Sequence, residues 1–226
     1  MTTAPPISDE VALRIALAAK VLPEISLKDL ITGLQSHFED EITEASLNKL
    51  TVSQLQKCLG MGSDDHLESL KEAVRILWGE TGEADQTFEI TPYDPQEWPH
   101  SIRIAVASNT GEQLDGHFGS CHRYLIYQLA ADKIALIDVR STVEADLVPD
   151  KSRFRVDLIQ DCALVYFVSI GGPAAAKVIQ ANIYPMKREQ GGAAREVLAE
   201  LQSAIATSPP PWLAKILAGN QPAPAQ

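Results

Sequence analysis

The chain of 226 residues is 45% hydrophobic and 22% charged, which is typical of a globular protein with one large domain or two small ones. It has no apolar run of membrane-spanning length, no signal-peptide pattern and only three scattered cysteines, so we expect a cytoplasmic protein without a membrane partner or a disulfide scaffold. The net charge of −11 arises in residues 1–100, which hold 7 Lys and Arg against 18 Asp and Glu, and such an acidic half excludes general nucleic-acid binding.

Residues 1–79 are predicted to fold as a bundle of about five helices. Ser8 precedes two acidic residues and is typical of a helix N-cap. Ser26 with Asp29 is typical of a capping box, and Ser63 is predicted to cap the last helix. The apolar residues of that last helix recur at three- and four-residue steps, as one buried face requires: Leu67, Leu70, Val74, Leu77 and Trp78.

Two stretches have the composition of a linker and of a tail. Residues 80–100 hold three prolines, many acidic side chains and little apolar periodicity. The end of the chain contains PPP and finishes in NQPAPAQ. We therefore predict a helical bundle over 1–79, an acidic linker over 80–100, an α/β domain over 101–207 and a flexible tail over 208–226.

The second half changes to the periodicity of strands. Strands are predicted at Ser101–Ser108, Arg123–Leu129, Ile134–Val139 and Asp161–Ile170. Helices are predicted at Ala174–Ala181 and Ala193–Ile205, and Gly191–Gly192 is expected only to start the second of them. Strands interleaved with helices predict an α/β domain with a mixed sheet, so the expected fold class of the whole chain is α + α/β.

The segment Leu114–Arg123 concentrates the residues that carry chemistry. It connects two predicted strands and holds His117, Cys121 and His122 within six residues. Imidazole and thiolate side chains bind iron and other transition metals, and the two glycines of the segment let a backbone approach a bulky ligand. If the loop turns helically, His117 and Cys121 share a face. The same residues also fit a plain hairpin connection, and their spacing does not decide between the two interpretations.

Longer segments of the chain carry a family resemblance. The runs SIRIAVAS, LDGHFGSCHRYLIYQL, IALIDVRS and DCALVYFVSIGGPAAAKVIQANIYPM resemble the dinitrogenase iron–molybdenum cofactor-binding domain. The earlier run LGMGSDDHLESLKEAVRILWG resembles a sterile-alpha-motif-like bundle. This pairing of domains is similar to that of the nitrogenase accessory gamma proteins, the NafY/NifY family, and covers nearly the whole chain.

The resemblance implies a non-catalytic carrier and chaperone in nitrogen fixation. Such a protein binds the iron–molybdenum cofactor, and its implied partners are apo-dinitrogenase and other cofactor-assembly proteins. The implied folds are a sterile-alpha-motif-like bundle that docks on apo-dinitrogenase and a cofactor-binding domain of ribonuclease H-like topology. An alternative function is a partner that stabilises apo-dinitrogenase without binding the cofactor.

The cofactor-binding histidine of the family falls on His117, which is therefore the expected metal ligand. The other predicted binding residues lie in the same loop: Gly116, Phe118, Gly119, Cys121, His122 and Arg123. For Cys121 and His122 two roles stay open, further ligation of the cluster or packing and hydrogen bonding. Arg123 is included because the cofactor with its homocitrate is anionic and favours cationic donors.

Two further features concern anion binding and catalysis. Basic residues at Lys151, Arg153, Arg155, Lys187 and Arg188 are candidates for contacts to an anion. The turn Ser169–Pro173 before a predicted helix is a candidate for a supporting contact through its amide groups. We expect no enzyme activity, because the strand SIRIAVAS lacks the carboxylates of a two-metal nuclease and Cys121 has no base fixed opposite it.

Overall fold

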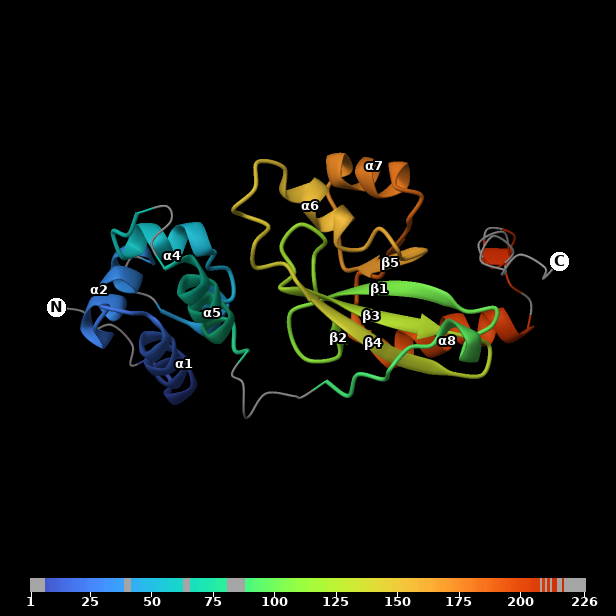
Figure 1. The fold of residues 1–226 in the computed structure, drawn as a ribbon, viewed down its shortest axis with the longest axis horizontal. Coiled ribbons are helices and arrows are strands. Elements are labelled where there is room, and N and C mark those ends of the chain that lie inside the picture. Colours follow the sequence, from blue (N-terminus) through green and yellow to red (C-terminus); the bar gives the residue numbers. More distant parts are fainter. Residues whose placement is uncertain are drawn as a thin grey trace. The chain divides into compact units, whose positions relative to one another are not determined.

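The computed structural model describes residues 7–38, 42–62, 66–80, 88–207, 209, 211, 213, 214 and 217. The chain divides into two compact units (Figure 1), one of Met1–Thr87 with Val143–Pro149 and one of Phe88–Thr142 with Asp150–Gln226. Within the described ranges, no helix is both long enough and apolar enough to cross a membrane. Most of the predicted flexible tail over 208–226 lies outside the described residues, but Leu213 within it is fully buried in an apolar core of the second unit, which differs from that prediction.

The first unit is helical, as the sequence predicts. Its described part contains α1 (Asp9–Val21), α2 (Leu27–His37), α3 (Glu44–Leu47), α4 (Val52–Cys58) and α5 (Leu67–Leu77). The predicted caps of the first two helices are confirmed: Ser8 accepts from the Val11 amide at 3.3 Å, and Ser26 and Asp29 form a capping box. The predicted cap Ser63 lies outside the described residues, and α5 follows His66, which has a left-handed backbone and no side-chain cap.

A segment distant in sequence completes the first unit. Val143 is 7% exposed and belongs to the same apolar core as the helices. The Asp146 carboxylate accepts from the Ser53 amide at 3.0 Å, and Lys71 Nζ lies 2.6 Å from a Glu144 carboxylate oxygen. Residues 143–149 fall inside the α/β domain that the sequence predicts. No local sequence pattern predicts that they pack with the helical bundle.

The second unit is built on a mixed sheet, which confirms the predicted combination of helices and mixed sheet. Its strands are β1 (Ile102–Ser108), β3 (Arg123–Leu129), β4 (Ile134–Ser141), β5 (Leu164–Phe167) and β6 (Tyr184–Lys187). They are ordered β4-β3-β1-β5-β6. Strand β3 is antiparallel to both of its neighbours, whereas β1, β5 and β6 are mutually parallel.

Helices cover both faces of this sheet (Figure 1). Helices α6 (Lys151–Asp157) and α7 (Gly172–Gln180) lie on one face, where Val156 and Val178 pack with Ala105 of β1. Helix α8 (Ala194–Thr207) lies on the other face, where Leu198 packs with Ile104 of β1. Successive residues of β1 thus face opposite layers, as the twofold period of a strand requires.

Two parts of the second unit differ from expectation. Residues 88–100, including the 3-10 helix η1 (Pro95–Glu97), pack on the sheet although a linker is predicted there. The Thr91 amide bonds to the Leu136 carbonyl at 2.8 Å, and Trp98 is 7% exposed. Gly192 does not merely start a helix, because β7 (Gly192–Ala193) pairs with β2 (Gln113–Leu114) before α8 begins.

Candidate functional site

The segment that the sequence singles out forms a loop over residues 115–122, here called the His117 loop, between β2 and β3. The Gly116 amide donates to the Ala107 carbonyl of β1 at 3.1 Å, and the Gly116 carbonyl accepts from the Val168 amide at 2.9 Å. The Phe118 amide donates to the Ser169 carbonyl at 2.9 Å. The loop is therefore fixed between the end of β1 and the segment that follows β5.

Gly116 is the residue that makes this close approach possible. A β-carbon at Gly116 would lie 2.7 Å from the Ala107 carbonyl carbon and 2.7 Å from Cys121 Cβ. Both distances are shorter than real contacts of this kind, and the Ala107 atom is main chain inside a sheet. Any side chain at position 116 would therefore push the loop away from β1.

Phe118 anchors the loop in the apolar layer beneath α6 and α7. Its side chain is fully buried, and its ring meets the Phe167 ring edge-on at a centroid distance of 6.2 Å. Its carbonyl accepts from the Tyr124 hydroxyl at 3.0 Å. The predicted binding residue Phe118 thus supports the loop from inside and does not line its outer surface.

His117 precedes this anchor and has the opposite environment. Its side chain is exposed, and Nδ1 lies 2.7 Å from Ser169 Oγ. Nε2 makes no hydrogen bond with any residue that the structure describes. One ring nitrogen is therefore held by the protein while the other faces solvent, which is the arrangement of many metal-binding histidines.

Small exposed residues occur in both segments that meet at the contact between His117 and Ser169. Gly119 in the loop, Gly171 before α7 and Gly172 at the start of α7 are exposed, and a β-carbon on any of them would meet no atom within 4 Å. Gly171 caps α7 without a side-chain hydrogen bond, so the first amide groups of the helix lie at this open surface. The predicted turn Ser169–Pro173 is thus brought to His117.

Cys121 and His122 do not join His117 on this surface. The loop does turn helically, because the Cys121 amide donates to the His117 carbonyl at 2.9 Å, but the Cys121 side chain is only 1% exposed. Its Sγ lies 3.3 Å from Nη1 of the buried Arg155. Burial nevertheless raises the pKa of the Cys121 thiol, with Arg155 opposing that shift. His122 is 2% exposed, and both side chains are unavailable to a ligand that approaches from solvent.

Arg123 is also directed away from His117. As a neighbour of Tyr124 on β3, it points to the sheet face opposite the one that buries Phe118. Its guanidinium donates to the Asn109 carbonyl at 2.6 Å and lies 5.3 Å from the centre of the Phe88 ring. The predicted contact between Arg123 and a ligand at His117 is therefore not formed in this structure.

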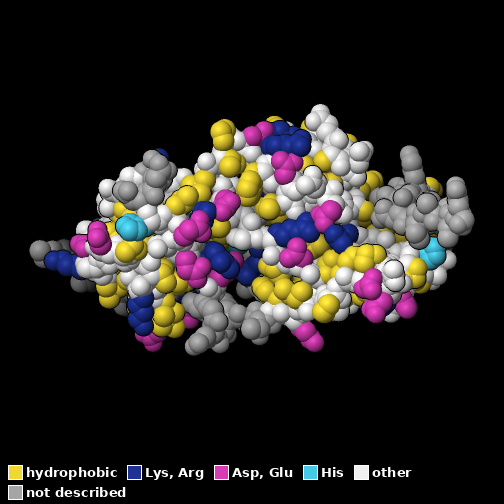
Figure 2. All heavy atoms as spheres, in the orientation of Figure 1, with side chains coloured by type: hydrophobic (Ala, Val, Ile, Leu, Met, Phe, Trp, Pro, Cys, Tyr) yellow, Lys and Arg dark blue, Asp and Glu magenta, His cyan; other side chains and the backbone are white. Residues whose placement is uncertain are grey.

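The other predicted cations do not make a basic cluster. Arg155 is buried, and three of the others are paired with carboxylates: Arg153 with Asp157, Lys187 with Glu189 and Arg188 with Glu200. On the face drawn in Figure 2, Lys and Arg side chains lie beside Asp and Glu side chains. Charge therefore does not mark a second site on that face.

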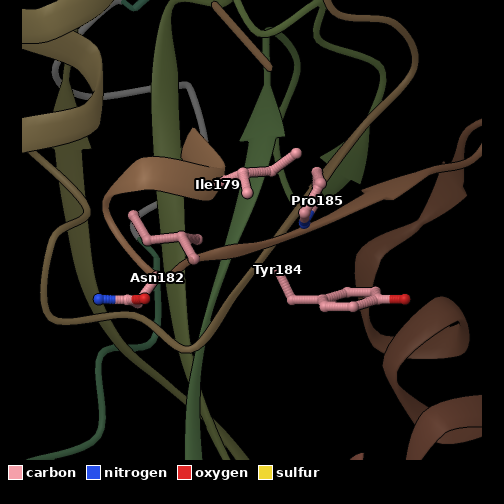
Figure 3. A pocket seen from close by; sticks show the side chains of 5 residues that line it. Ile179, Asn182, Tyr184 and Pro185 are labelled. Atoms are coloured by element: carbon pink, nitrogen blue, oxygen red, sulfur yellow. The ribbon is translucent and has the colours of Figure 1, made fainter. Parts of the chain in front are cut away.

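A hollow of about 430 Å³ lies elsewhere in the second unit, between α7 and β6 (Figure 3). It is lined by Ile179, Asn182, Ile183, Tyr184 and Pro185, so it is mostly apolar. It contains neither a histidine nor a cysteine. The residues that line this hollow therefore include none of the metal-binding residue types of the His117 loop.

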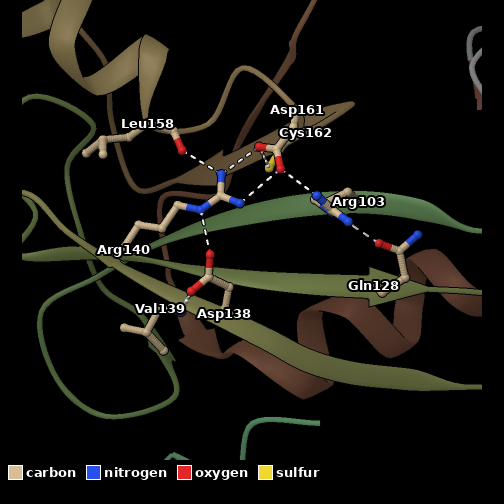
Figure 4. A network of polar contacts seen from close by, with 8 residues as sticks. All are labelled: Arg103, Gln128, Asp138, Val139, Arg140, Leu158, Asp161 and Cys162. Carbon is tan, nitrogen blue, oxygen red and sulfur yellow. Dashed lines mark hydrogen bonds and ion pairs between the residues drawn. The ribbon is translucent and has the colours of Figure 1, made fainter. Parts of the chain in front are cut away.

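A network of ion pairs lies before the start of β5 (Figure 4), whereas Ser169 follows the end of that strand. Arg140 contacts Asp161 at 2.5 Å and Asp138 at 2.8 Å, and Arg103 contacts Asp161 at 2.5 Å. Hydrogen bonds from Arg140 and Arg103 hold the pKa of Asp161 well below its usual range. The network joins β1 and β4 to the turn before β5, and β5 itself is shorter than the predicted strand Asp161–Ile170, because it spans only Leu164–Phe167.

Comparison with known proteins identifies the family. Residues 7–89 match the family model "Dinitrogenase iron-molybdenum cofactor, N-terminal", and residues 100–204 match "Dinitrogenase iron-molybdenum cofactor". Protein NifY of Azotobacter vinelandii is 40% identical over 225 residues, covering 96% of this chain and 93% of that protein. The chain belongs to the NifY/NafY family.

Two other relatives match one half of the chain each. Protein NifX of Rhodobacter capsulatus is 29% identical over 135 residues, which cover 57% of this chain and 85% of that protein. The solved N-terminal domain of NafY is 36% identical and covers 40% of this chain and 100% of that domain, with a TM-score of 0.31. Membership in the NifY/NafY family gives this chain a role in the maturation of the nitrogenase iron–molybdenum cofactor.

Sequence reasoning located His117 but missed Ser169 as its partner. The two residues are 52 positions apart. The strand topology could have predicted this contact. The carboxyl ends of neighbouring parallel strands meet at one edge of a sheet, and β1 and β5 are such neighbours. Among the described residues, no group of three or more His, Cys, Asp or Glu side chains could hold a metal ion.

Proposed function

We propose that this protein is a non-catalytic carrier that binds the iron–molybdenum cofactor through His117 and delivers it to apo-dinitrogenase. The observation that carries the proposal is the environment of the His117 imidazole, which is exposed at Nε2 and held at Nδ1 by Ser169. A neutral imidazole nitrogen that faces solvent is a suitable ligand for one metal of a preassembled cluster.

The number of ligands supports transient binding. A cage of four protein ligands holds a metal permanently, whereas a carrier must release its cargo. His117 is an exposed ligand without a cluster of acidic, thiol or imidazole side chains around it in the described part of the chain. We therefore propose ligation by His117 alone, with Cys121 and His122 supporting the loop from inside.

The surface beside His117 supports a bulky, anionic cargo. Gly119, which follows His117 by two residues, and Gly171 and Gly172, which follow Ser169, have open space beside their α-carbons. The uncapped start of α7 presents amide groups there, and the positive end of a helix dipole favours negative charge. A cofactor that carries homocitrate is of this kind.

The first unit is proposed to dock on apo-dinitrogenase. We propose that it is a sterile-alpha-motif-like bundle, and that the second unit has a ribonuclease H-like topology. The strand order β4-β3-β1-β5-β6 with an antiparallel β3 supports the second assignment. Other cofactor-assembly proteins are further proposed partners, and we place the protein in the cytoplasm.

Spectroscopic titration of extracted iron–molybdenum cofactor with the full chain tests the ligand assignment. We expect the wild-type protein to change the electron paramagnetic resonance spectrum of the cofactor and His117→Ala to lose that change. His37→Ala is the matched control, because His37 is an exposed histidine at the end of α2 in the other unit. Equal binding by wild type and His117→Ala would reject the assignment.

The acidity of residues 1–100 favours a second candidate function, in which the protein stabilises apo-dinitrogenase without binding the cofactor. A pull-down of apo-dinitrogenase with the wild-type chain and with His117→Ala separates the two. A carrier that delivers its cargo binds apo-dinitrogenase in both forms but transfers cofactor only as wild type. A pure stabilising partner protects apo-dinitrogenase equally well in both forms and shows no cofactor binding in either.

A further inference from the structure

Ser169 contacts the His117 loop with both its side chain and its main chain. Its Oγ lies 2.7 Å from His117 Nδ1, and its carbonyl accepts from the Phe118 amide at 2.9 Å. We propose that Ser169 is a positioning residue, whose Oγ accepts a hydrogen bond from His117 Nδ1–H so that Nε2 is the nitrogen that ligates the cluster. This inference rests on the proposed function and specifies the atom through which it operates.

The contacts around Ser169 fix its hydroxyl relative to the imidazole. Three consecutive loop residues, 116, 117 and 118, bond to two consecutive residues, Val168 and Ser169. Phe118 in turn is fully buried against Phe167, the last residue of β5. The short Ser169 side chain is thus held next to His117 by the same contacts that hold the loop against the segment after β5.

The position of the hydrogen bond selects the ligating nitrogen. Neutral imidazole carries one proton, so a proton on Nδ1 leaves the lone pair on Nε2. Nε2 is the nitrogen that has no partner among the described residues, and it belongs to an exposed side chain. Ligation through Nδ1 would require the bond to Ser169 to break. In the proposed arrangement Nδ1 keeps its proton before and after the cluster binds.

A hydroxyl as the second partner suits a carrier. Residues that hydrogen-bond to a metal-binding histidine orient its ring and raise its basicity. A carboxylate in this position would strengthen the metal bond more, because a charged acceptor makes a stronger hydrogen bond than a neutral one. Ser169 therefore orients His117 without making its bond to the cluster too strong to release.

Nitrogen-15 NMR of the cofactor-free full chain tests the tautomer. We expect His117 in the wild type to carry its proton on Nδ1. We expect Ser169→Ala to shift the population towards the Nε2-protonated form, and Ser169→Thr, which keeps an Oγ, to restore the wild-type spectrum. Ser203→Ala is the matched control, because Ser203 is an exposed serine on α8 whose hydroxyl makes no hydrogen bond among the described residues. A wild-type ring protonated on Nε2, or a tautomer unaffected by Ser169→Ala, would overturn the proposal.

Titration with extracted iron–molybdenum cofactor gives the second readout. Loss of a hydrogen bond to a metal-binding histidine weakens binding by about 10- to 100-fold, and we expect Ser169→Ala to do so while Ser169→Thr and Ser203→Ala do not. An unchanged affinity in Ser169→Ala would overturn the positioning role. Failure of the wild type to bind cofactor would overturn the proposed function instead, and the tautomer measured without cofactor would still decide what Ser169 does to His117.

Discussion

His117 and Cys121 begin and end one turn of the same loop, and they lie in opposite environments. The His117 imidazole is exposed and makes a single side-chain hydrogen bond, whereas the Cys121 thiol is 1% exposed beside the Arg155 guanidinium. A cluster of metal-binding residue types in a sequence can therefore divide into exposed and buried side chains. In this loop the buried side chains of Phe118 and Cys121 form what is here called the frame, and the exposed His117 is here called the tip.

Phe118→Ala should produce the largest effect, because it removes the center of the frame. The side chain is fully buried between Phe167 and Tyr124, and such a truncation costs about 3–5 kcal/mol in the free energy of unfolding. Urea denaturation of the full chain measures this loss. The control Ile179→Ala removes an apolar side chain that is 59% exposed and should change stability by no more than about 0.5 kcal/mol. A small effect of Phe118→Ala would mean that the frame does not hold the loop.

Gly116→Ala should have the next largest effect, because it forces the loop from β1. The added methyl group would meet the Ala107 main chain and Cys121 Cβ at 2.7 Å, and overpacking of this kind costs about 1–3 kcal/mol. Gly119→Ala is the matched control, because a β-carbon there meets nothing within 4 Å. Both variants are compared by thermal and urea unfolding. Equal stability of the two variants would contradict the close contacts that the structure predicts for a β-carbon at position 116.

Asp161→Asn tests whether the frame is independent of the ion pairs at the other end of β5. Arg140 and Arg103 lower the pKa of Asp161 in the folded protein, so its charge stabilises the fold above the ordinary pKa of about 4 and this contribution is lost as the pH falls further. Because the Asp161 side chain is 36% exposed, we expect a loss of only about 0.5–1.5 kcal/mol at pH 7, decreasing below pH 4.

Urea denaturation of wild type and Asp161→Asn between pH 7 and pH 3 measures the difference. Cofactor binding at pH 7 should be the same for both proteins, since Asp161 precedes β5 and Ser169 follows it. A difference in stability that grows as the pH falls would contradict the assignment, and a loss of cofactor binding would show that the two ends of the sheet are coupled.

Local patterns predicted the longer helices and strands and the exposed His117, but not the strands β2, β6 and β7 or the buried side chains of the loop. The caps at Ser8 and Ser26 and the alternation of β1 depend on residues close in sequence, and the structure confirms them. The turn from His117 to Cys121 was also foreseen as one possibility. A shared helical face, however, does not determine whether both ends of one turn face solvent, and Cys121 is covered by residues from α6 and β3.

Contacts between distant segments account for what the sequence did not predict. Ser169 reaches His117 only because β1 and β5 are parallel neighbours. Residues 143–149 belong to the first unit through Val143 and Asp146, which have no local signal for it. Arg123 follows His122 directly in the chain, but the alternation of β3 directs it to the other face of the sheet.

His117→Ala should have the smallest effect on stability, and it is the sharpest test of the comparison. The imidazole is exposed and has one hydrogen bond, so its removal should change the free energy of unfolding by no more than about 0.5 kcal/mol. The NMR chemical shift of the Phe118 amide should remain that of a hydrogen-bonded group, because the substitution alters neither this amide nor its acceptor, the Ser169 carbonyl. A loss of cofactor binding in His117→Ala would then occur without a change in the structure of the loop. If His117→Ala instead destabilised the protein by as much as Gly116→Ala, His117 would belong to the frame, and an absence of cofactor binding in that variant would no longer identify a ligand.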